Sequence, residues 1–327
     1  MNNAIELFAA LGQRLRDFGN NLQSQKVMEE ACACNAWFSP NEVRRAIEAL
    51  VREMLQRDKL AAWLARYPAL PADKPCHVLV VMAGNIPLVG FFDLLCTLAS
   101  GHACRVKPSA KDSVLMEYVI ALLHEIDPAL PVEIYNGMSP VDAVIATGSN
   151  NAVRYFQSHY AGIPSLLRGS RQSVAVLAGN ETPEQLARLS DDIWAYSGLG
   201  CRNVSLIFVP EGYKPKLHVI STNNKYRNNY IQQRALLSMQ GKAFVDLGGA
   251  LMIEQRAFPD ALSCIACSHY RSMEEVCEWL ETHDNELQCV VSECIEHSRR
   301  VGFGHSQSPT LTDYPDDADV MEWLSKL

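Results

Sequence analysis

The chain has 327 residues, of which 48% are hydrophobic and 20% charged, and its formal net charge is −8. This composition suits one large globular domain or two moderate ones, and the negative charge argues against a nucleic-acid partner. The 11 cysteines, an odd number without a framework spacing, predict a reduced protein rather than a disulfide scaffold.

The N-terminal stretch MNNAIELFAALGQRLRDF has neither the basic region nor the clean apolar region of a signal peptide. Residues 86–100 form the longest apolar stretch. It contains Asp93 and is too short to span a bilayer, so it predicts a buried helix. We therefore expect a cytoplasmic protein with no membrane span.

The first 70 residues predict helices. Ser39-Pro40-Asn41-Glu42 has the form of a capping box with proline at the first helical position. The residues that follow place their apolar side chains on one helical face, namely Val43, Ile47, Leu50, Val51 and Met54. A second helix is expected over residues 60–67, and the proline-rich stretch 68–75 indicates a linker.

From His77 the pattern changes to apolar, β-rich runs that alternate with amphipathic stretches. Strands are predicted over residues 77–82, 103–107, 132–135, 142–147, 173–179 and 203–209. Helices are predicted over the apolar stretch that ends near residue 100 and over residues 111–127, 150–160 and 182–198. Such alternation is typical of βαβ units and a parallel sheet, and residues 211–298 continue as α/β with weaker signals.

Four short segments lie at junctions between predicted strands and helices, where α/β proteins bind ligands. Residues 83–87 (AGNIP) follow the first strand and combine a glycine suited to a tight turn with Asn85, which offers an amide donor. Residues 105–109 (RVKPS) place Lys107 and Ser109 after the next strand, where they suit a nucleotide ribose or phosphate. Taken singly, the first segment also fits an ordinary turn, and Lys107 fits a solvated surface residue.

The third segment lies at the start of a predicted helix, and the fourth contains a cysteine. Residues 146–150 (ATGSN) open a helix with groups that suit a phosphate, although a simple N-cap explains them as well. Residues 197–203 (SGLGCRN) place Cys201 beside glycines that let another molecule approach the backbone. Cys96 lies instead in an apolar helix and is expected to be inert core. The absence of a G-x-G-x-x-G fingerprint argues against a standard Rossmann motif.

In this order, the stretches AGNIP, VKPS, ATGS and GLGCRN resemble the aldehyde dehydrogenase superfamily, together with KYRNNY and the acidic, proline-containing end. The closer resemblance is to its acyl-CoA reductase branch, which includes the fatty acid reductase of bacterial luminescence systems, and it extends over nearly the whole chain. It implies an α/β fold of two doubly wound parallel-sheet domains with an N-terminal helical segment. That superfamily binds its nicotinamide cofactor without the missing fingerprint.

The resemblance assigns Cys201 as the catalytic thiol and Asn85 as the amide that stabilises the oxyanion. Hydrolytic relatives have a Glu-Leu-Gly-Gly-Lys stretch whose glutamate activates water, whereas residues 167–171 read Leu-Arg-Gly-Ser-Arg, with Leu167 in that place. A leucine cannot activate water, while exchange of an acyl group with a thiol needs no such base. The resemblance therefore implies reduction of an acyl thioester to an aldehyde through an acyl-cysteine.

For the cofactor, Lys107 and Ser109 match the adenosine-ribose site, and Gly148 and Ser149 match the turn beside the pyrophosphate and nicotinamide. Glu254 is the match for the glutamate on the nicotinamide ribose, although its flanking sequence EQRAFP departs from the family pattern. The reductive role in the family favours NADPH, and the residues leave NADH open.

The expected domain plan has three parts. Residues 1–173 hold the helical segment and the cofactor-binding domain, residues 174–303 form the catalytic domain, and residues 304–327 form a tail that packs back on the first domain. The resemblance implies acyl-CoA or an acyl carrier protein as the acyl donor, and a homodimer follows the habit of the superfamily.

Two other functions fit the same residues. A cysteine acyltransferase would use Cys201 without a nucleotide, and a non-catalytic member of the fold would act by binding a partner. The group that activates the thiol is also open among His159, His218 and His305, although a structural or surface role fits each of them better.

Cysteine pairs and a basic segment raise two further alternatives. Cys264 and Cys267 form a C-x-x-C, and Cys32 and Cys34 form a C-x-C, but their distance in sequence and the apolar run SCIAC argue against zinc. Residues 225–234 (KYRNNYIQQR) mix basic and aromatic side chains, a pattern that can suit nucleic acid. In a chain of net charge −8, a solvated helix face or a wall of the acyl site fits better.

Overall fold

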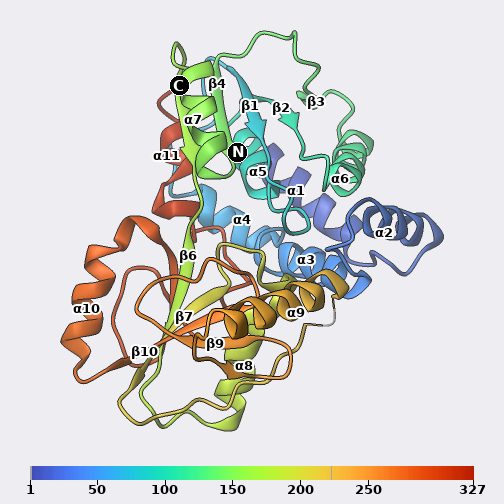
Figure 1. The fold of residues 1–327 in the computed structure, drawn as a ribbon. Coiled ribbons are helices and arrows are strands. Elements are labelled where there is room, and N and C mark those ends of the chain that lie inside the picture. Colours follow the sequence, from blue (N-terminus) through green and yellow to red (C-terminus); the bar gives the residue numbers. More distant parts are fainter. Residues whose placement is uncertain (1, 222) are drawn as a thin grey trace. The chain divides into compact units, whose positions relative to one another are not determined.

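The computed structural model describes residues 2–221 and 223–327 and divides into two compact units. The first unit comprises Met1–Ser170 and Thr310–Leu327, and the second comprises Arg171–Pro309. Each unit has its own sheet of mainly parallel strands with helices beside it (Figure 1). This confirms the predicted α/β fold with two parallel-sheet domains and an N-terminal helical segment. The boundaries were expected after residues 173 and 303 and fall after residues 170 and 309.

The first unit consists of N-terminal helices, a five-stranded sheet, the helices that connect its strands and the closing part of the chain. Its helices are α1 (Asn2–Leu15), α2 (Leu22–Cys34), α3 (Pro40–Glu53), α4 (Arg57–Leu64), α5 (Phe91–Ala99), α6 (Ser113–Ile126), α7 (Asn150–His159), the 3-10 helix η3 (Pro315–Asp317) and α11 (Val320–Leu324). Its strands are β1 (His77–Val81), β2 (Ala103–Lys107), β3 (Val132–Ile134), β4 (Ala143–Thr147) and β5 (Ser165–Arg168).

The sheet of this unit has the order β3-β2-β1-β4-β5, and its paired strands are parallel. β1 is buried from Val78 to Val81, as expected for a strand covered on both faces. The strand order reverses between β1 and β4, and open α/β sheets bind ligands beyond the carboxyl ends of their strands at such a switch point. β5 was not predicted, because it is a short and largely half-exposed strand at the sheet edge.

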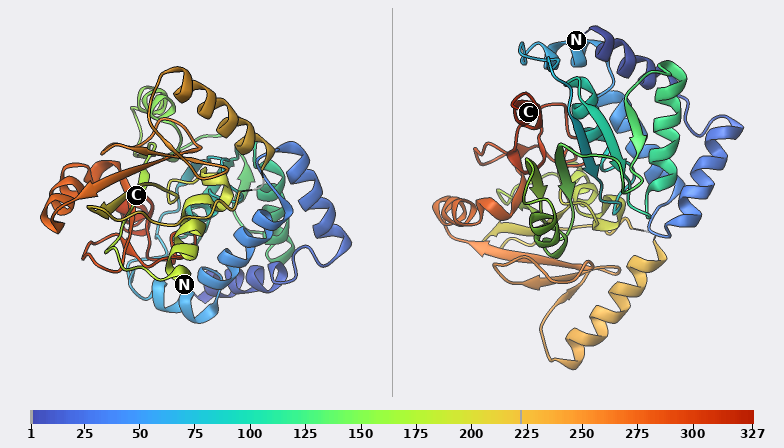
Figure 2. Two further views of the ribbon diagram at one scale, coloured as in Figure 1. Left: turned by 60° about the horizontal axis from the view of Figure 1, so that its bottom comes forward. Right: turned by 90° about the horizontal axis from the view of Figure 1, so that it is seen from above.

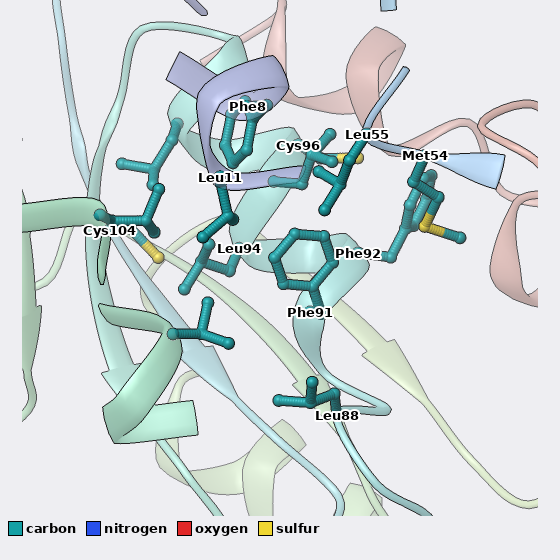
Figure 3. Packing of buried hydrophobic residues seen from close by; sticks show 14 of the residues in the cluster. Phe8, Leu11, Met54, Leu55, Leu88, Phe91, Phe92, Leu94, Cys96 and Cys104 are labelled. Carbon is teal, nitrogen blue, oxygen red and sulfur yellow. The ribbon is translucent and has the colours of Figure 1, made fainter. Parts of the chain in front are cut away.

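One hydrophobic core joins the N-terminal helices to this sheet. All residues of α5 are buried, which explains its continuous apolar sequence. Phe8 of α1 meets Phe91 of α5 edge-on at a ring-centroid distance of 6.5 Å, and Figure 3 shows Phe8 and Leu11 next to the α5 side chains. Met321 and Leu324 of α11 belong to the same core, so the closing segment packs within the first unit.

Helix α3 begins where the sequence predicts. The hydroxyl of Ser39 accepts the Glu42 N–H at 3.3 Å and donates to Glu42 Oε2 at 3.0 Å, while Pro40 occupies the first helical position. A cap of this kind is worth about 1 kcal/mol. The predicted apolar face is buried at Val43 and Ile47, which anchors the helix in the core.

The second unit consists of a seven-stranded sheet and the helices that connect its strands. Its helices are α8 (Pro183–Trp194), the 3-10 helix η1 (Ala195–Gly198), α9 (Asn224–Met239), α10 (Met273–Thr282) and the 3-10 helix η2 (Asp284–Glu286). Its strands are β6 (Gln172–Val176), β7 (Val204–Pro210), β8 (Val245–Asp246), β9 (Leu251–Glu254), β10 (Cys264–Tyr270), β11 (Leu287–Val291) and β12 (Arg300–Val301).

The second sheet has the order β12-β11-β6-β7-β10-β9-β8, and its strands pair in parallel except β8 with β9. Its central strands are apolar and buried, and Phe208 of β7 packs against Trp279 of α10 with ring centroids 5.0 Å apart. α9 is the long helix seen in both views of Figure 2, and it buries Tyr226 and Leu237 while most of its other side chains are exposed.

Among the helices of residues 2–221 and 223–327, none is both long and apolar enough to cross a membrane.

Candidate active site

Three of the four predicted segments meet at the carboxyl edge of the first sheet. Val81, the last residue of β1, pairs with Lys107 of β2. It also pairs with Ala146 of β4. The loops that follow these three positions therefore leave adjacent strands at the topological switch point, which is where a ligand is expected.

Gly84 is required by the close approach of a second loop. A Cβ atom on Gly84 would lie 2.6 Å from both the Cβ and the Oγ of Ser109, so a side chain is excluded there. The Ser109 hydroxyl accepts the Lys111 N–H at 3.3 Å. Asn85, half-buried, directly follows this contact, while the Lys107 side chain is exposed at the end of β2. The first unit thus brings Asn85 and Ser109 into neighbouring loops.

Two buried residues that sequence reasoning missed bind these loops together. Asn35 follows the end of α2, and its Nδ2 donates to the carbonyl oxygens of Gly84 at 3.4 Å and Lys111 at 3.2 Å. Asp112 accepts the Leu88 N–H on Oδ2 at 2.7 Å. Burial raises the pKa of Asp112 to about 8, opposed by the bond from Leu88. Both residues stand at helix ends, where Asn and Asp are common caps, so residue type alone does not indicate a role at the site.

In the ATGS segment, Ser149 caps α7, as the simpler interpretation predicts. Its hydroxyl accepts the Ala152 N–H at 3.3 Å. The N–H of Gly148 donates to the Arg168 carbonyl at 3.1 Å, and a Cβ on Gly148 would lie 2.9 Å from that of Ala152. Local contacts therefore account for the presence of a glycine at position 148 and a serine at position 149. The capped N-terminus of α7 still lies at the carboxyl edge, where its partial positive charge suits a phosphate.

In residues 167–171, the Leu-Arg-Gly-Ser-Arg stretch, the first two side chains contact other residues of the first unit. Leu167 is partly buried and packs against an apolar cluster that includes Leu79 and Val144. Arg168 is 3% exposed, and its Nη1 donates to both carboxylate oxygens of Asp93 at 2.8 Å. The position that resembles the water-activating glutamate is therefore occupied by an apolar side chain in the sheet packing.

In the second unit, Cys201 lies in the turn between η1 and β7 with its side chain exposed. Asn203, which is 4% exposed, fixes this turn. Its Oδ1 accepts the Gly200 N–H at 2.8 Å. Its Nδ2 donates to three carbonyl oxygens at the end of α8, at 3.1, 3.1 and 2.9 Å, those of Asp192, Ile193 and Ala195. These carbonyls need partners because the helix ends there.

The backbone before Cys201 has an uncommon conformation. Tyr196, Ser197 and Gly198 have φ values of 51°, 56° and 71°. The left-handed conformation costs on the order of 1 kcal/mol for a residue with a side chain. Such strain persists where the surrounding structure enforces it, as the bonds from Asn203 do here, and it concentrates at functional sites.

Asp192 ties a later loop of the second unit to α8. Its carboxylate accepts the Gly304 N–H at 2.6 Å, the Ser306 N–H at 3.0 Å and the Ser306 hydroxyl at 2.7 Å. Burial raises the pKa of Asp192, and these hydrogen bonds oppose the shift. Residues 302–306 are thereby fixed to the helix that leads into the Cys201 turn, and His305 in that loop is exposed.

Ser173 connects the Cys201 turn to the interior of the sheet. Its hydroxyl donates to the Cys201 carbonyl at 2.9 Å and accepts the Cys289 N–H at 3.2 Å. Burial raises the pKa of the Cys289 thiol to about 11. A buried neutral thiol is a poor nucleophile, so of these two cysteines the exposed Cys201 is the one suited to react.

The second unit does not bring Glu254 to Cys201. β7, β10 and β9 are parallel neighbours, yet Cys201 precedes the amino end of β7 and Glu254 is the carboxyl end of β9. The Glu254 side chain is 82% exposed and lies 3.6 Å from His269 Nδ1. Because the two residues stand toward opposite ends of parallel strands, this geometry lends no support to Glu254 as the ligand of the nicotinamide ribose.

The remaining candidate histidines and cysteines lie in surroundings that are typical of structural or surface residues. In the first unit, His159 stacks on Tyr155 with ring centroids 5.4 Å apart. His218, in the second unit, is exposed. Cys264 and Cys267 are buried in β10, and no three His, Cys, Asp or Glu side chains within the described ranges come together as a metal site.

The KYRNNYIQQR segment forms most of α9. Tyr226 is buried and its hydroxyl accepts the Trp194 Nε1–H at 2.8 Å. Tyr230 donates to the Asp246 carboxylate at 2.7 Å. Both tyrosines of the segment are thus engaged within the second unit, which does not favour base stacking as their role.

Residues 13–222, more than half of the chain, match the model of the family described as Acyl-CoA reductase (LuxC). A curated relative, the Long-chain acyl-protein thioester reductase 2 of Photobacterium leiognathi, is 28% identical over 162 residues. The match covers 43% of this chain and 32% of the relative, so this chain corresponds to about a third of the relative's length.

Two solved structures share the fold. Aldehyde dehydrogenase 21 of Physcomitrella patens, in complex with the reaction product succinate, has a TM-score of 0.66 and 11% identity, and the match covers 99% of this chain and 84% of that chain. The NAD⁺ complex of an aldehyde dehydrogenase from Bacillus cereus has a TM-score of 0.61 and 15% identity, covering 89% and 71%. The fold is therefore that of the aldehyde dehydrogenases.

Proposed function

Because the chain belongs to the acyl-CoA reductase (LuxC) family, we propose that it reduces an acyl thioester to an aldehyde with a nicotinamide cofactor and Cys201 as nucleophile. The main support is the exposed thiol of Cys201 in a turn that Asn203 fixes through four hydrogen bonds. Both residues lie within the matched region, residues 13–222. A reactive cysteine needs this combination of access and a defined position.

The carboxyl edge of the first sheet fits the cofactor. Lys107 contributes an exposed ammonium group and Ser109 a half-buried hydroxyl, and Gly148 and Ser149 lead into the N-terminus of α7. Such groups suit a ribose and a pyrophosphate. When bound, the reduced cofactor supplies a hydride to the acyl carbon. We propose NADPH, since Lys107 suits a 2′-phosphate, with NADH as the alternative because the B. cereus structure holds NAD⁺.

The first step forms an acyl-enzyme. The Cys201 thiolate attacks the carbonyl carbon, a new C–S bond forms, and the carbonyl electron pair moves to oxygen. We assign the Asn85 amide and the Cys201 backbone N–H as donors to this oxyanion. When the oxyanion collapses, the C–S bond to the carrier breaks and the carrier leaves as a thiolate that takes up a proton. One thioester replaces another, so the step is nearly balanced in free energy.

The second step releases the product. Once the acyl carbon is reduced, it carries an oxyanion and the Cys201 sulfur, and the same donors stabilise that oxygen. Collapse to the aldehyde breaks the C–S bond and returns the Cys201 thiolate. Hydrolysis competes poorly because Leu167, which occupies the place of the water-activating glutamate, packs with apolar residues.

The acyl donor is proposed to be carried by coenzyme A or by an acyl carrier protein. The P. leiognathi relative is named for long-chain acyl-protein thioesters, so a long acyl chain is the first to test. The protein corresponds to about a third of that relative. The test therefore uses acyl groups of several lengths, so that a preference for shorter acyl groups would also be detected.

The test is nicotinamide absorbance with purified protein, NADPH and acyl-CoA thioesters from short to long chains. We expect absorbance to fall and aldehyde to form with the wild type and with Cys294→Ala, which changes another exposed cysteine of the second unit. Cys201→Ala should show neither. Acyl transfer to an added thiol without any loss of NADPH would contradict the reductase and favour a cysteine acyltransferase.

A further inference from the structure

Two loops of the first unit are joined by two buried polar residues. We call residues 83–88, which carry Asn85, the oxyanion loop, and residues 107–112 the nucleotide loop. We infer that Asn35 and Asp112 are positioning residues that hold these loops in register and make the placement of Asn85 sensitive to alkaline pH. The inference rests on the proposed function for the role of Asn85, but the link between the loops is a property of the first unit alone.

Asn35 is the residue of this pair whose side chain does not titrate. It is 4% exposed, and its Oδ1 accepts the Trp37 N–H at 3.0 Å, which sets the orientation of the amide. Its Nδ2 then faces the Gly84 carbonyl in the oxyanion loop and the Lys111 carbonyl in the nucleotide loop, at 3.4 and 3.2 Å. Each loop therefore contributes one acceptor to the same nitrogen, and a shift of either loop breaks a bond to it.

Asp112 is the residue of this pair whose side chain can titrate. Its Oδ2 accepts the N–H of Leu88, a buried residue in the left-handed conformation, with φ 55°. A buried N–H in such a turn needs an acceptor, and this bond secures the end of the oxyanion loop. The other oxygen, Oδ1, is buried and makes no hydrogen bond with the described residues. A carboxyl group with one idle buried oxygen is better suited to the neutral acid than to the anion.

Within the described part of the chain, no charged side chain is among the causes that shift the pKa of Asp112. Residues 83–88 have no titratable side chain. Lys107 and Lys111, on the nucleotide loop itself, have exposed side chains, as does Cys34 at the end of α2. Burial is accordingly the main cause that raises the pKa of Asp112, to about 8, and the bond from Leu88 opposes it.

The sign of the pH effect follows from this raised pKa. Below about pH 8 the folded protein keeps Asp112 neutral, and the link between the loops is intact. Above it, ionisation places a buried charge beside Leu88 and Gly84, and the charge is relieved when the loops separate and water enters. Acylation of Cys201, which depends on Asn85, should therefore slow at alkaline pH through loss of its oxyanion donor.

Asp112→Asn tests this directly, because an asparagine keeps the acceptor for Leu88 and cannot ionise. The readout is the ratio of wild-type to variant rate of Cys201 acylation from pH 6 to pH 9.5. Titration of the thiol affects both proteins equally and cancels. We expect this ratio to be near one at pH 6. It should fall about tenfold by pH 9.5, because a pH roughly one or two units above the pKa leaves the acid mostly ionised. A flat ratio would overturn the inference.

A second readout does not depend on any activity. Between pH 5 and pH 8 the unfolded chain has released the Asp112 proton and the folded chain has not, so wild-type stability declines with rising pH relative to Asp112→Asn. The difference in melting temperature between the two proteins should widen up to about pH 8 and then level off. A difference that does not change with pH would show that Asp112 titrates normally and that the inference is wrong.

The Asn35 half is tested by Asn35→Asp, which turns the shared donor into an oxygen that faces two carbonyls. Acylation should slow at least tenfold at every pH, while Asn35→Gln, which keeps the donor on a longer side chain, should recover part of the rate. Equal rates in all three proteins would contradict the role of Asn35. If none of the proteins forms aldehyde but the melting curves behave as described, the proposed function is wrong and the link between the loops stands.

Discussion

The loop that carries Asn85 and the turn that carries Cys201 are each fixed by buried polar side chains, but of different chemistry. Asp112 holds the Asn85 loop through one carboxyl oxygen, while its other oxygen has no hydrogen bond with the described residues. Asn203 holds the Cys201 turn with one accepted and three donated hydrogen bonds. An amide both donates and accepts and carries no charge, whereas a buried acid fits its site in one protonation state.

We therefore expect the Asn85 loop and the Cys201 turn to differ in their sensitivity to pH. The hydrogen bonds that Asn203 makes in the Cys201 turn should not depend on pH, because its amide does not titrate. The Asn85 loop should lose its geometry above about pH 8, where Asp112 ionises.

Cys201→Ala should abolish aldehyde formation at every pH. Removal of a covalent nucleophile costs on the order of 10⁴-fold or more in turnover. Steady-state rates with NADPH and an acyl-CoA measure the loss, and Cys289→Ala, at the buried neighbour, should retain turnover if folded. Activity of Cys201→Ala within tenfold of the wild type would contradict the assignment of Cys201 as the nucleophile.

Asn85→Ala should lower the acylation rate by roughly 100- to 1000-fold, the usual cost of one oxyanion donor. It should also remove the alkaline decline, because that decline acts through Asn85. Rapid-quench measurement of the acyl-enzyme at pH 7 and pH 9.5 gives both results. A full alkaline decline in Asn85→Ala would show that Asp112 acts on something else.

Asn203→Ala should slow acylation by about 100-fold, the order expected when a reacting group is displaced by about 1 Å. It should also reduce the free energy of unfolding by about 3 kcal/mol, because the part-buried N–H of Gly200 and three carbonyls lose a partner. Stopped-flow kinetics and denaturant unfolding measure these losses. Their size should be the same at pH 6 and pH 9, and a pH-dependent loss would remove the contrast with Asp112.

Lys107→Ala should give the smallest effect. An exposed ion pair is worth about 0.2–1 kcal/mol, which corresponds to a rise of at most about fivefold in the KM for NADPH with kcat unchanged. The same change should leave the KM for NADH unaltered if Lys107 pairs with a 2′-phosphate. Equal effects on both cofactors would remove the basis for preferring NADPH.

Much of the fold follows from local sequence signals. The N-cap at Ser39, the apolar run of β1 and the amphipathic stretch of α6 all appear within a few residues of their predicted bounds. β5 escaped prediction because its four residues at a sheet edge are mostly not buried, so its sequence lacks the continuous apolar pattern. The expected boundary after residue 173 rests on the resemblance, because a local pattern does not show which of two sheets a strand joins.

The roles predicted for Cys201 and Asn85 rest on the resemblance. The need for a glycine at position 84 could be expected from turn chemistry, and the close approach of Ser109 accounts for it. The residues that support them, such as Asn203 and Asp112, act through contacts set by the tertiary structure, and their types equally suit ordinary turns and caps. Glu254 rests on the resemblance alone, since the register of the sheet places it toward the opposite end of the strands from Cys201.

The most direct test of the central claim is a single-turnover experiment followed by intact-protein mass spectrometry and peptide mapping. The wild type is mixed with a long-chain acyl-CoA without cofactor, and NADPH is then added. We predict that one acyl group attaches to Cys201 and is discharged as aldehyde on addition of NADPH. An adduct on another cysteine, or one on Cys201 that leaves only as free acid, would contradict a reductase that acts through Cys201.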